Sequence, residues 1–190
     1  MPHLLFLSNL LISKGVLVLL DACKILKDRG YSFVCEFVGG ETAEIDATRF
    51  DKKVRSRGLN TIAVYQGRKY GEEKHKAFEH ADMFVFPTYY GNETLGLVNL
   101  EAMEHKLPVV TTNEGGITDV VRNGENGLIA DRKNSETLAD NIEILLDSED
   151  MRHKMGENGY RKFKEKFTLK AFEHKFAECM HKIGIRGNNT

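Results

Sequence analysis

The sequence lacks the features that mark several common classes of protein. Its three cysteines are widely spaced and form no C-x-x-C, so neither a disulfide framework nor a cysteine-rich zinc site is expected. Its 27 basic and 28 acidic residues nearly cancel, and no block of like charge occurs, which disfavours a nucleic-acid partner. With 41% hydrophobic and 29% charged residues, the 190-residue chain has the composition of an ordinary globular domain.

Long apolar runs are also missing. The apolar beginning, residues 4–20, is interrupted by Ser8, Asn9, Ser13 and Lys14, so it is too polar for a membrane span. It also lacks the basic flank and the small-residue cleavage site of a signal peptide. Together with the odd number of cysteines, this predicts a reduced, cytoplasmic protein; association with the inner face of a membrane stays compatible with it.

Familiar catalytic motifs are absent as well. No G-x-S-x-G surrounds Ser8 or Ser13, and Gly39-Gly40 lacks the third glycine of a dinucleotide fingerprint. The histidines lack the spacing and the neighbouring glutamate of a metalloprotease helix. We therefore expect no metal and no nicotinamide cofactor.

Short apolar runs alternate with helical patterns along the first 130 residues. The patterns predict strands at residues 4–7, 33–38, 61–64, 83–86, 108–111 and 128–129, with helices at about 16–28, 41–57, 70–80 and 95–105. Fully apolar strands separated by helices indicate a parallel sheet covered on both faces. The sequence therefore predicts an α/β fold: a Rossmann-like, three-layer α/β/α domain with a parallel sheet of about six strands.

The last third of the chain contains helical patterns only. One helix is predicted around residues 138–146, a second short one at Met151 and Met155, and a third at residues 169–183 that Thr168 could cap. No linker or repeat interrupts the chain. We predict one domain over residues 1–185, ending in helices, and a flexible tail over residues 186–190.

The turn after the first predicted strand brings a cation to the start of a helix. Ligands of an open parallel sheet bind outside the carboxyl ends of its strands. Lys14 and Gly15 lie at this position, at the start of a helix. The lysine ammonium and the positive end of the helix dipole are then close together, and one anion could bind to both. The alternative is that Lys14 is a solvated surface lysine.

The turn after the fourth predicted strand is richer. Gly96 allows a ligand to approach the amides of the residues that begin the next helix. Glu93 precedes that helix and Glu101 lies within it, and the two would be roughly 12 Å apart if the run were straight helix. The paired carboxylates of glycosidases are closer than this, so such a pair would require the turn to fold back. We interpret the two carboxylates as flanking an extended ligand whose hydroxyls they bind. The alternatives are a helix-dipole partner for Glu93 and a solvated helix face for Glu101.

The string around these residues resembles the signature of a known family. It reads Pro-x5-Glu-x-x-Gly-Leu-Val-x-Leu-Glu-Ala-Met over residues 87–103, and further matches are Lys14-Gly15, Gly67, and residues 81–87, 115–117 and 123–128. In this order the pieces resemble retaining glycosyltransferases of family 4, with their E-x7-E motif, in the GT-B fold. Nearly the whole chain resembles their C-terminal half, which binds the nucleotide-sugar.

The resemblance implies a role for each motif residue. Glu101 would bind the ribose hydroxyls and Glu93 the donor hexose, while Lys14 neutralises the diphosphate together with the amides of Gly96, Leu97 and Val98. The implied nucleotide site also includes Asn9, Gly15, Arg68 and Thr94. The resemblance implies no metal and no cofactor, because the nucleotide-diphospho-sugar, UDP- or GDP-linked, is the substrate.

Three places depart from the family pattern, one of them Thr118-Asp119, which stands where Pro-Glu is common. Ser8-Asn9-Leu10 stands where the family usually has Gly-Arg-Leu, so a second cation is missing there, and Arg68 or Lys69 is the candidate substitute. Lys106 replaces the glycine that usually ends the E-x7-E helix, at a position that favours positive φ.

The resemblance also implies what the chain lacks. The N-terminal acceptor domain is absent, so this chain would bind the donor without transferring it, and the last helix, with Phe172 and Phe176, would pack across to that domain. The full-length protein would transfer a hexose to a glycan or lipid-linked acceptor, as in polysaccharide biosynthesis. The alternatives are a non-catalytic nucleotide-binding or scaffolding module and a GT-B sugar-nucleotide epimerase.

Overall fold

The computed structural model describes residues 1–182 and contains one parallel sheet. Its strands are β1 (His3–Leu7), β2 (Val34–Val38), β3 (Ala63–Tyr65), β4 (Met83–Phe86), β5 (Val109–Thr112) and β6 (Gly127–Ala130). They lie in the order β3-β2-β1-β4-β5-β6, that of a doubly wound Rossmann-like sheet. The predicted parallel sheet of six strands is confirmed.

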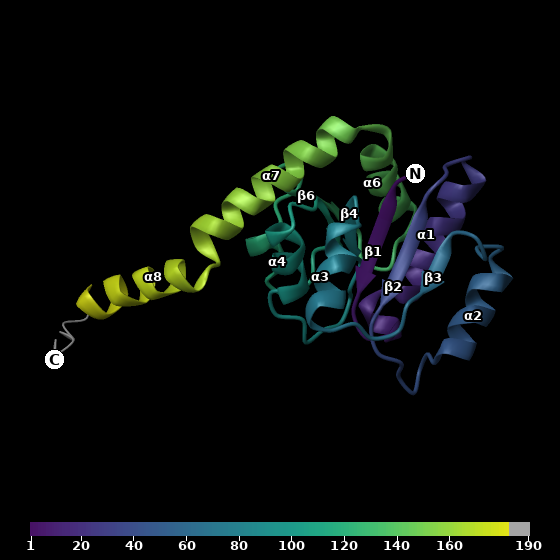
Figure 1. The fold of residues 1–190 in the computed structure, drawn as a ribbon, viewed down its shortest axis with the longest axis horizontal. Helices are drawn as coiled ribbons and strands as arrows, with labels where there is room; N and C mark the ends of the chain where they lie inside the picture. The colour runs from purple at the N-terminus through teal and green to yellow at the C-terminus, as the bar shows by residue number, and fades with distance from the viewer. Residues whose placement is uncertain (183–190) are drawn as a thin grey trace.

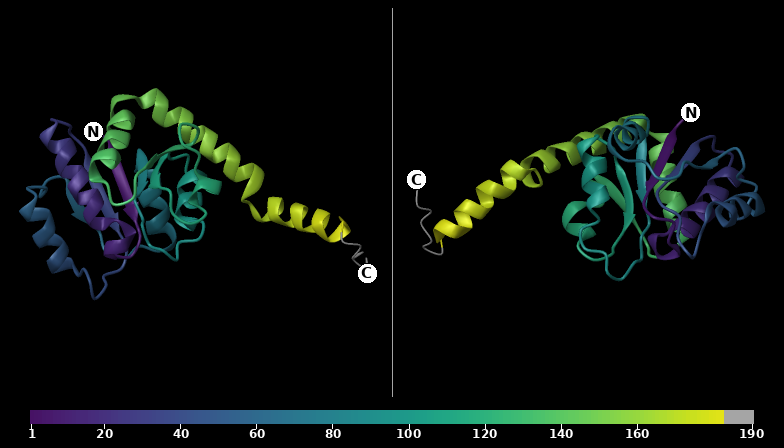
Figure 2. Two further views of the ribbon diagram at one scale, coloured as in Figure 1. Left: turned by 180° about the vertical axis from the view of Figure 1, so that it is seen from behind. Right: turned by 60° about the horizontal axis from the view of Figure 1, so that its bottom comes forward.

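Helices cover both faces of the sheet. They are α1 (Val16–Asp28), α2 (Ala47–Ser56), α3 (Gly71–Glu79), α4 (Leu97–Glu104), α5 (Ile117–Val120), α6 (Ser135–Asp147), α7 (Glu149–Lys166) and α8 (Leu169–Lys182), with a short 3-10 helix at Ile12–Lys14. α1 and α6 pack together on one face, in front of the sheet in the left view of Figure 2, and α3 and α4 cover the other in Figure 1. The predicted three-layer architecture is confirmed.

The strands are apolar on both sides because both sides are covered. Every residue of β4 and β5 is buried, including Thr111 and Thr112. Phe6 and Phe37 of neighbouring strands lie with their ring centroids 5.4 Å apart in the core. This double burial explains why the strands show continuous apolar runs rather than alternation.

Two helices differ from their predicted bounds. The predicted helix at 41–57 begins only at Ala47, because Thr42 holds a turn through its hydroxyl and Asp46 caps the helix by accepting from the Arg49 amide at 2.7 Å. The predicted short helix at Met151 and Met155 is wrong in length: α7 runs for 18 residues. Its buried face continues through Gly156 and Gly159, which have no apolar side chain to reveal it.

The last helix stands apart from the sheet. In Figure 1, α8 extends away from the body at the end of α7, and none of its residues is buried. Phe172 and Phe176 are 63% and 55% exposed, and Thr168 accepts from the Ala171 amide at 3.2 Å, which confirms the predicted cap. The predicted tail at 186–190 lies outside the described residues. Between residues 1 and 182, no helix combines the length and apolarity that crossing a bilayer requires.

The strand order reverses its direction between β1 and β4. From β1 the chain winds outward to β2 and β3, then returns to place β4 on the other side of β1. The loops after β1 and β4 lie side by side at this point of the carboxyl edge, where the Tyr89 amide donates to the Ser13 carbonyl at 2.8 Å, and ligands of such sheets bind outside this edge. We call this place the crevice.

Candidate functional site

An ion pair spans this crevice. Lys14 Nζ lies 2.7 Å from Glu93 Oε2, joining the loop after β1 to the loop after β4, and the two side chains are only 16% and 11% exposed. The same ammonium lies 4.4 Å from the ring centroid of Tyr90 and 5.6 Å from that of Phe86, within reach of cation–π attraction. The solvated-lysine alternative for Lys14 is thus wrong.

Glycine is required where Lys14 enters the helix. Gly15 has φ 87° and caps α1, and a Cβ atom there would collide with the Pro87 carbonyl of the loop after β4. The close approach of these two loops is what holds Lys14 against Glu93. The predicted start of a helix at Lys14-Gly15 is confirmed.

The start of α4 forms a second part of the crevice. Gly96 is its N-cap with φ 58°, and no side chain between residues 1 and 182 caps the helix. The turn before it is fixed by Gly116, whose amide donates to the Thr94 carbonyl at 2.6 Å, while Gly115 lies against the Glu93 carbonyl. Leu97, the first helical residue, is 67% exposed, whereas Gly96 before it is buried, and the first turn has no side-chain cap.

Glu101 lies one turn further along α4 and has a different partner. Its Oε1 is 2.6 Å from Nζ of Lys74, which belongs to the first turn of α3. Next to this pair, His75 and His105 form a 2.6 Å hydrogen bond between α3 and the end of α4. Glu101 therefore does not lie on a solvated helix face alone; it faces a cation from the neighbouring helix.

Lys74 escaped the sequence analysis although a signal for it exists. It is a lysine in the first turn of a helix that begins at the carboxyl edge of the sheet, which is the argument that singled out Lys14. Its pairing with a glutamate 27 residues away is visible only in the fold.

Asn9 and Arg68 lie at a smaller cavity beside the crevice. The Asn9 side-chain oxygen accepts from the Gly40 amide at 3.2 Å, so Asn9 ties together the loops after β1 and β2. The cavity, of about 160 Å³, is lined by Asn9, Gly40, Arg68, Lys69, Tyr70 and Lys74, among others. Lys74 therefore borders both this cavity and Glu101.

The predicted site residues thus fall into two groups. Lys14, Gly15 and Glu93 meet at the crevice beside the turn that carries Thr94, Gly96, Leu97 and Val98. Asn9 and Arg68 line the smaller cavity, and Glu101 reaches it through Lys74.

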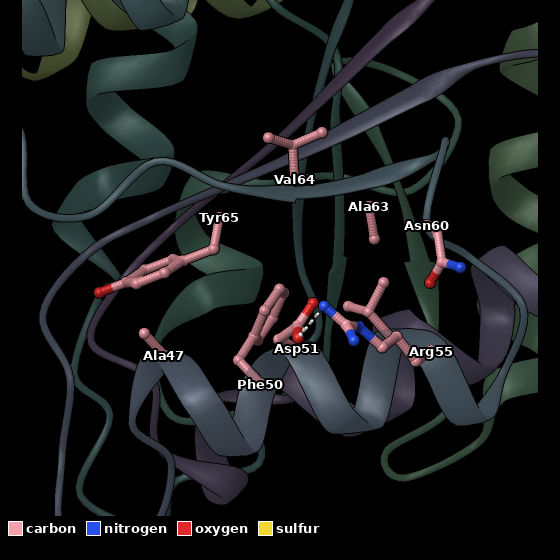
Figure 3. A pocket seen from close by; sticks show the side chains of 9 residues that line it. Ala47, Phe50, Asp51, Arg55, Asn60, Ala63, Val64 and Tyr65 are labelled. Carbon is pink, nitrogen blue, oxygen red and sulfur yellow. Dashed lines mark ion pairs between the residues drawn. The ribbon is translucent and has the colours of Figure 1, made fainter.

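A larger cavity lies elsewhere. It measures about 580 Å³ between α2 and the edge strand β3, and Figure 3 shows the side chains that line it. Its two charged residues, Asp51 and Arg55, neutralise each other at 2.9 Å. Since it is remote from the strand-order reversal and its charges are paired, we do not assign the site to it. In the described part of the chain, no three His, Cys, Asp or Glu side chains gather as metal ligands would.

The backbone at the end of α4 has the positive φ that the sequence predicts. Lys106, which follows α4, has φ 59°, the left-handed conformation expected where the family usually has glycine. Its amine pairs with Glu157 at 2.8 Å.

Comparisons with known proteins agree with this architecture. Residues 2–162 match the family model described as glycosyl transferases group 1. The capsular polysaccharide biosynthesis glycosyltransferase CapM of Staphylococcus aureus is 28% identical over 163 residues, covering 86% of this chain and 41% of CapM. The uncharacterized glycosyltransferase MJ1178 of Methanocaldococcus jannaschii is 31% identical over 164 residues, covering 86% and 43%. The chain thus spans less than half the length of these curated relatives.

Solved structures show the same fold. The C-terminal domain of the glycosyl transferase group 1 protein LpcC from Francisella tularensis has a TM-score of 0.78 at 22% identity, covering 88% of this chain and 87% of that one. Anabaena HepE, solved with UDP, has a TM-score of 0.84 at 20% identity, covering 95% and 48%. The predicted likeness to half of a GT-B glycosyltransferase is confirmed, and the chain belongs to the glycosyl transferases group 1 family.

Proposed function

We propose that this chain binds the nucleotide-diphospho-sugar donor of a retaining glycosyltransferase. The observation that carries the proposal is the Lys14–Glu93 pair, held at 2.7 Å across the strand-order reversal beside the uncapped start of α4. A diphosphate there would meet a cation and free helix amides together. That HepE was solved with UDP and with UDP-glucose supports a donor of this class.

Each residue then has a distinct task. The departing nucleoside diphosphate develops negative charge, and Lys14 with the amides of Gly96, Leu97 and Val98 stabilises it. Glu93 binds hydroxyls of the hexose and Glu101 those of the ribose. These tasks need no metal ion and no cofactor.

The whole protein would transfer a hexose to a glycan or lipid-linked acceptor. We infer that residues 1–185 are its donor-binding domain, that the acceptor domain belongs to a longer protein, and that this chain alone does not complete the transfer. The exposed apolar face of α8, with Phe172 and Phe176, supports a contact with that second domain. We place the protein in the cytoplasm, in a pathway of polysaccharide synthesis.

The test is calorimetric titration of the chain with UDP and GDP. We expect one of them to bind, and Lys14→Ala to weaken that binding by roughly tenfold or more, because a hydrogen bond to a charged group contributes about 1.5–3 kcal/mol. Uridine or guanosine, without phosphates, should bind the variant as it binds the wild type. Lys106→Ala removes a lysine that also pairs with a glutamate, in the exposed Lys106–Glu157 pair, and is the matched control.

Substituting Glu93 should change the affinity for the nucleoside diphosphate in the direction opposite to Lys14→Ala. Since Glu93 neutralises Lys14 in the free protein, Glu93→Gln should strengthen binding of the nucleoside diphosphate while removing the extra affinity that the hexose of a nucleotide-sugar adds. Glu101→Ala should weaken the binding of the nucleotide and leave the binding of pyrophosphate unchanged. A folded wild type that binds neither nucleotide would reject the proposal and favour a scaffolding module.

A further inference from the structure

Two histidine side chains meet outside the crevice, between α3 and the end of α4. His75 Nδ1 lies 2.6 Å from His105 Nε2, and the two ring centroids are 4.5 Å apart. A ring nitrogen of histidine donates when it carries a proton and binds a proton or a metal ion when it does not. What this contact can bind therefore depends on where the protons of the two rings lie.

The far nitrogen of His105 is tied to the backbone of α4. Nδ1 of His105 lies 2.8 Å from the Glu101 carbonyl oxygen, and since that oxygen can only accept, Nδ1 carries the proton. In the neutral ring, Nε2 then keeps the lone pair that faces His75. Phe78 stacks on the same ring with centroids 4.8 Å apart and an interplanar angle of 20°, which fixes the orientation of His105.

The far nitrogen of His75 also faces an acceptor. Its Nε2 lies 3.3 Å from Glu79 Oε1, one turn further along α3. A carboxylate at this place favours a proton on Nε2, so Nδ1 keeps the lone pair that faces His105. With neutral rings held in this way, both facing nitrogens are acceptors, and a cation must lie between them. That cation is either the proton of a hydrogen bond or a metal ion.

The surroundings favour a cation that takes further ligands. A cavity of about 220 Å³ adjoins the pair, and both imidazoles line it together with the side chains of Lys74, Glu101 and Glu104. The two carboxylates outweigh the single ammonium, so the lining is negative when the imidazoles are neutral. The cavity also leaves room for water molecules beside the two rings, which a metal ion needs and a shared proton does not.

We propose that His75 and His105 bind a divalent transition-metal ion such as Zn²⁺, with water completing its coordination. Imidazole nitrogen suits this class of ion, whereas Mg²⁺ and Ca²⁺ prefer oxygen ligands. Between residues 1 and 182 no third His, Cys, Asp or Glu side chain converges with the pair, so the protein supplies two ligands. The ion would tie α3 to the end of α4, and it takes no part in the proposed transfer.

Binding requires a small movement of one ring. Zn–N bonds of about 2.0–2.1 Å in tetrahedral geometry place two nitrogens roughly 3.3 Å apart, which is wider than the present 2.6 Å. The His75 side chain is 52% exposed and has the freedom to move outward by this amount. His105 stays in place, because Phe78 and the Glu101 carbonyl hold it.

The experiment is calorimetric titration of the chain with Zn²⁺, after treatment with EDTA and desalting. We expect His75→Gln and His105→Gln each to lower the number of bound Zn²⁺ ions by one. Zn²⁺ should raise the thermal midpoint of the wild type and not that of the two variants, since a ligand of the folded state stabilises it. Mg²⁺ at the same concentration should leave the midpoint unchanged.

His174 offers a matched control. Like His75, it lies close to a glutamate one turn further along its own helix, with His174 Nε2 3.4 Å from Glu178 Oε1. Among residues 1–182 no imidazole forms a hydrogen bond with it, whereas His75 has His105. His174→Gln should therefore keep both the Zn²⁺ stoichiometry of the wild type and the rise in its thermal midpoint.

Two results would overturn the inference. One is a folded wild type that binds no Zn²⁺, since the contact between the two rings would then hold a shared proton. The other is a His75→Gln variant that binds as many Zn²⁺ ions as the wild type, equally tightly. The thermal midpoint in EDTA shows whether each variant is folded, and the half-exposed His75 suffices for the test if His105→Gln does not fold. The titrations with UDP and GDP contain no Zn²⁺, so they test the proposed function separately.

Discussion

Asn99 and Asn126 are both fully buried, but the structure satisfies only one of them. Asn126 accepts from the Arg122 amide at 2.8 Å and donates to the Val120 carbonyl at 3.2 Å. The side-chain amide of Asn99 has no hydrogen-bond partner between residues 1 and 182, although it lies beside the Cα of Gly96. Asn99 therefore leaves a buried polar group unpaired next to the candidate site.

These two residues should respond differently to truncation. We expect Asn126→Ala to lower the free energy of unfolding by about 1–3 kcal/mol, because it leaves a buried amide and a carbonyl with fewer partners. Asn99→Ala removes a group that has no partner to lose, so its cost should be clearly smaller. Urea unfolding of both variants measures the difference. Equal losses would show that Asn99 is satisfied, for example by water.

At this scale the sequence predicted where the motif residues lie in the fold but not which side chains they contact, and their roles stay predictions. The chemistry of Glu93, Glu101 and Lys14 follows from their places at strand ends and helix starts. Their partners do not, because Lys14 and Glu93 are 79 residues apart and Lys74 and Glu101 are 27 apart. Such pairs depend on which helices the sheet brings together.

Among the elements of the fold, α1 and α6 are joined by a cluster of charged side chains. Just after α1, Arg29 contacts three acids of α6, namely Glu136, Asp140 and Glu143. Tyr31 donates its hydroxyl to Glu143 at 3.0 Å and contacts Asp147 at the same distance. These contacts fix the two helices of one layer against each other.

The Tyr31 contacts predict a pH dependence of stability. Desolvation and the hydrogen bonds to Asp147 and Glu143 raise the pKa of Tyr31 from 10.0 to about 12. A raised folded-state pKa means that the protonated phenol contributes stability fully below pH 10 and loses it as the pH rises toward 12. Tyr31→Phe should therefore be less stable than wild type at neutral pH, and the gap should close over that window. Urea unfolding at several pH values measures it; a constant gap would contradict the linkage.

Elements were predictable where apolar side chains mark them. All six strands lie within about two residues of their predicted places because each is an apolar run between polar turns. The length of α7 was not predictable, because Gly156 packs directly against the Lys106 backbone and contributes no side chain to the pattern. Lys162, buried and donating to the Val120 carbonyl at 2.7 Å, reads as a surface residue in the sequence.

At the scale of the whole molecule, α8 contributes little to the stability of the sheet domain. None of its residues is buried, and its main contact is with α7. Deleting residues 168–190 should therefore change the thermal midpoint by less than about 2 °C, since 1 kcal/mol shifts it by roughly 2–4 °C in a domain of this size. Thermal unfolding followed by circular dichroism tests this.

The same deletion should have a second effect. The exposed Phe172 and Phe176 stack on each other with centroids 5.9 Å apart and form an apolar face open to solvent. Removing them should reduce concentration-dependent self-association in sedimentation experiments. A large drop in the thermal midpoint would instead show that α8 folds back on the domain in solution.

The pairing of β1 with β4 also bears on how the chain folds. Two residue pairs join these strands, Leu4 with Met83 and Leu5 with Phe84. The His3 amide supports them by donating to Asp82 at 2.7 Å, and the paired residues are 79 positions apart in the sequence. Contacts that distant in sequence require closing a long loop, so they form late. Lys14 and Glu93 meet directly beyond this pairing and share its separation. The crevice therefore forms only as the two halves of the sheet join, so a partly folded chain lacks the Lys14–Glu93 pair and with it the candidate site.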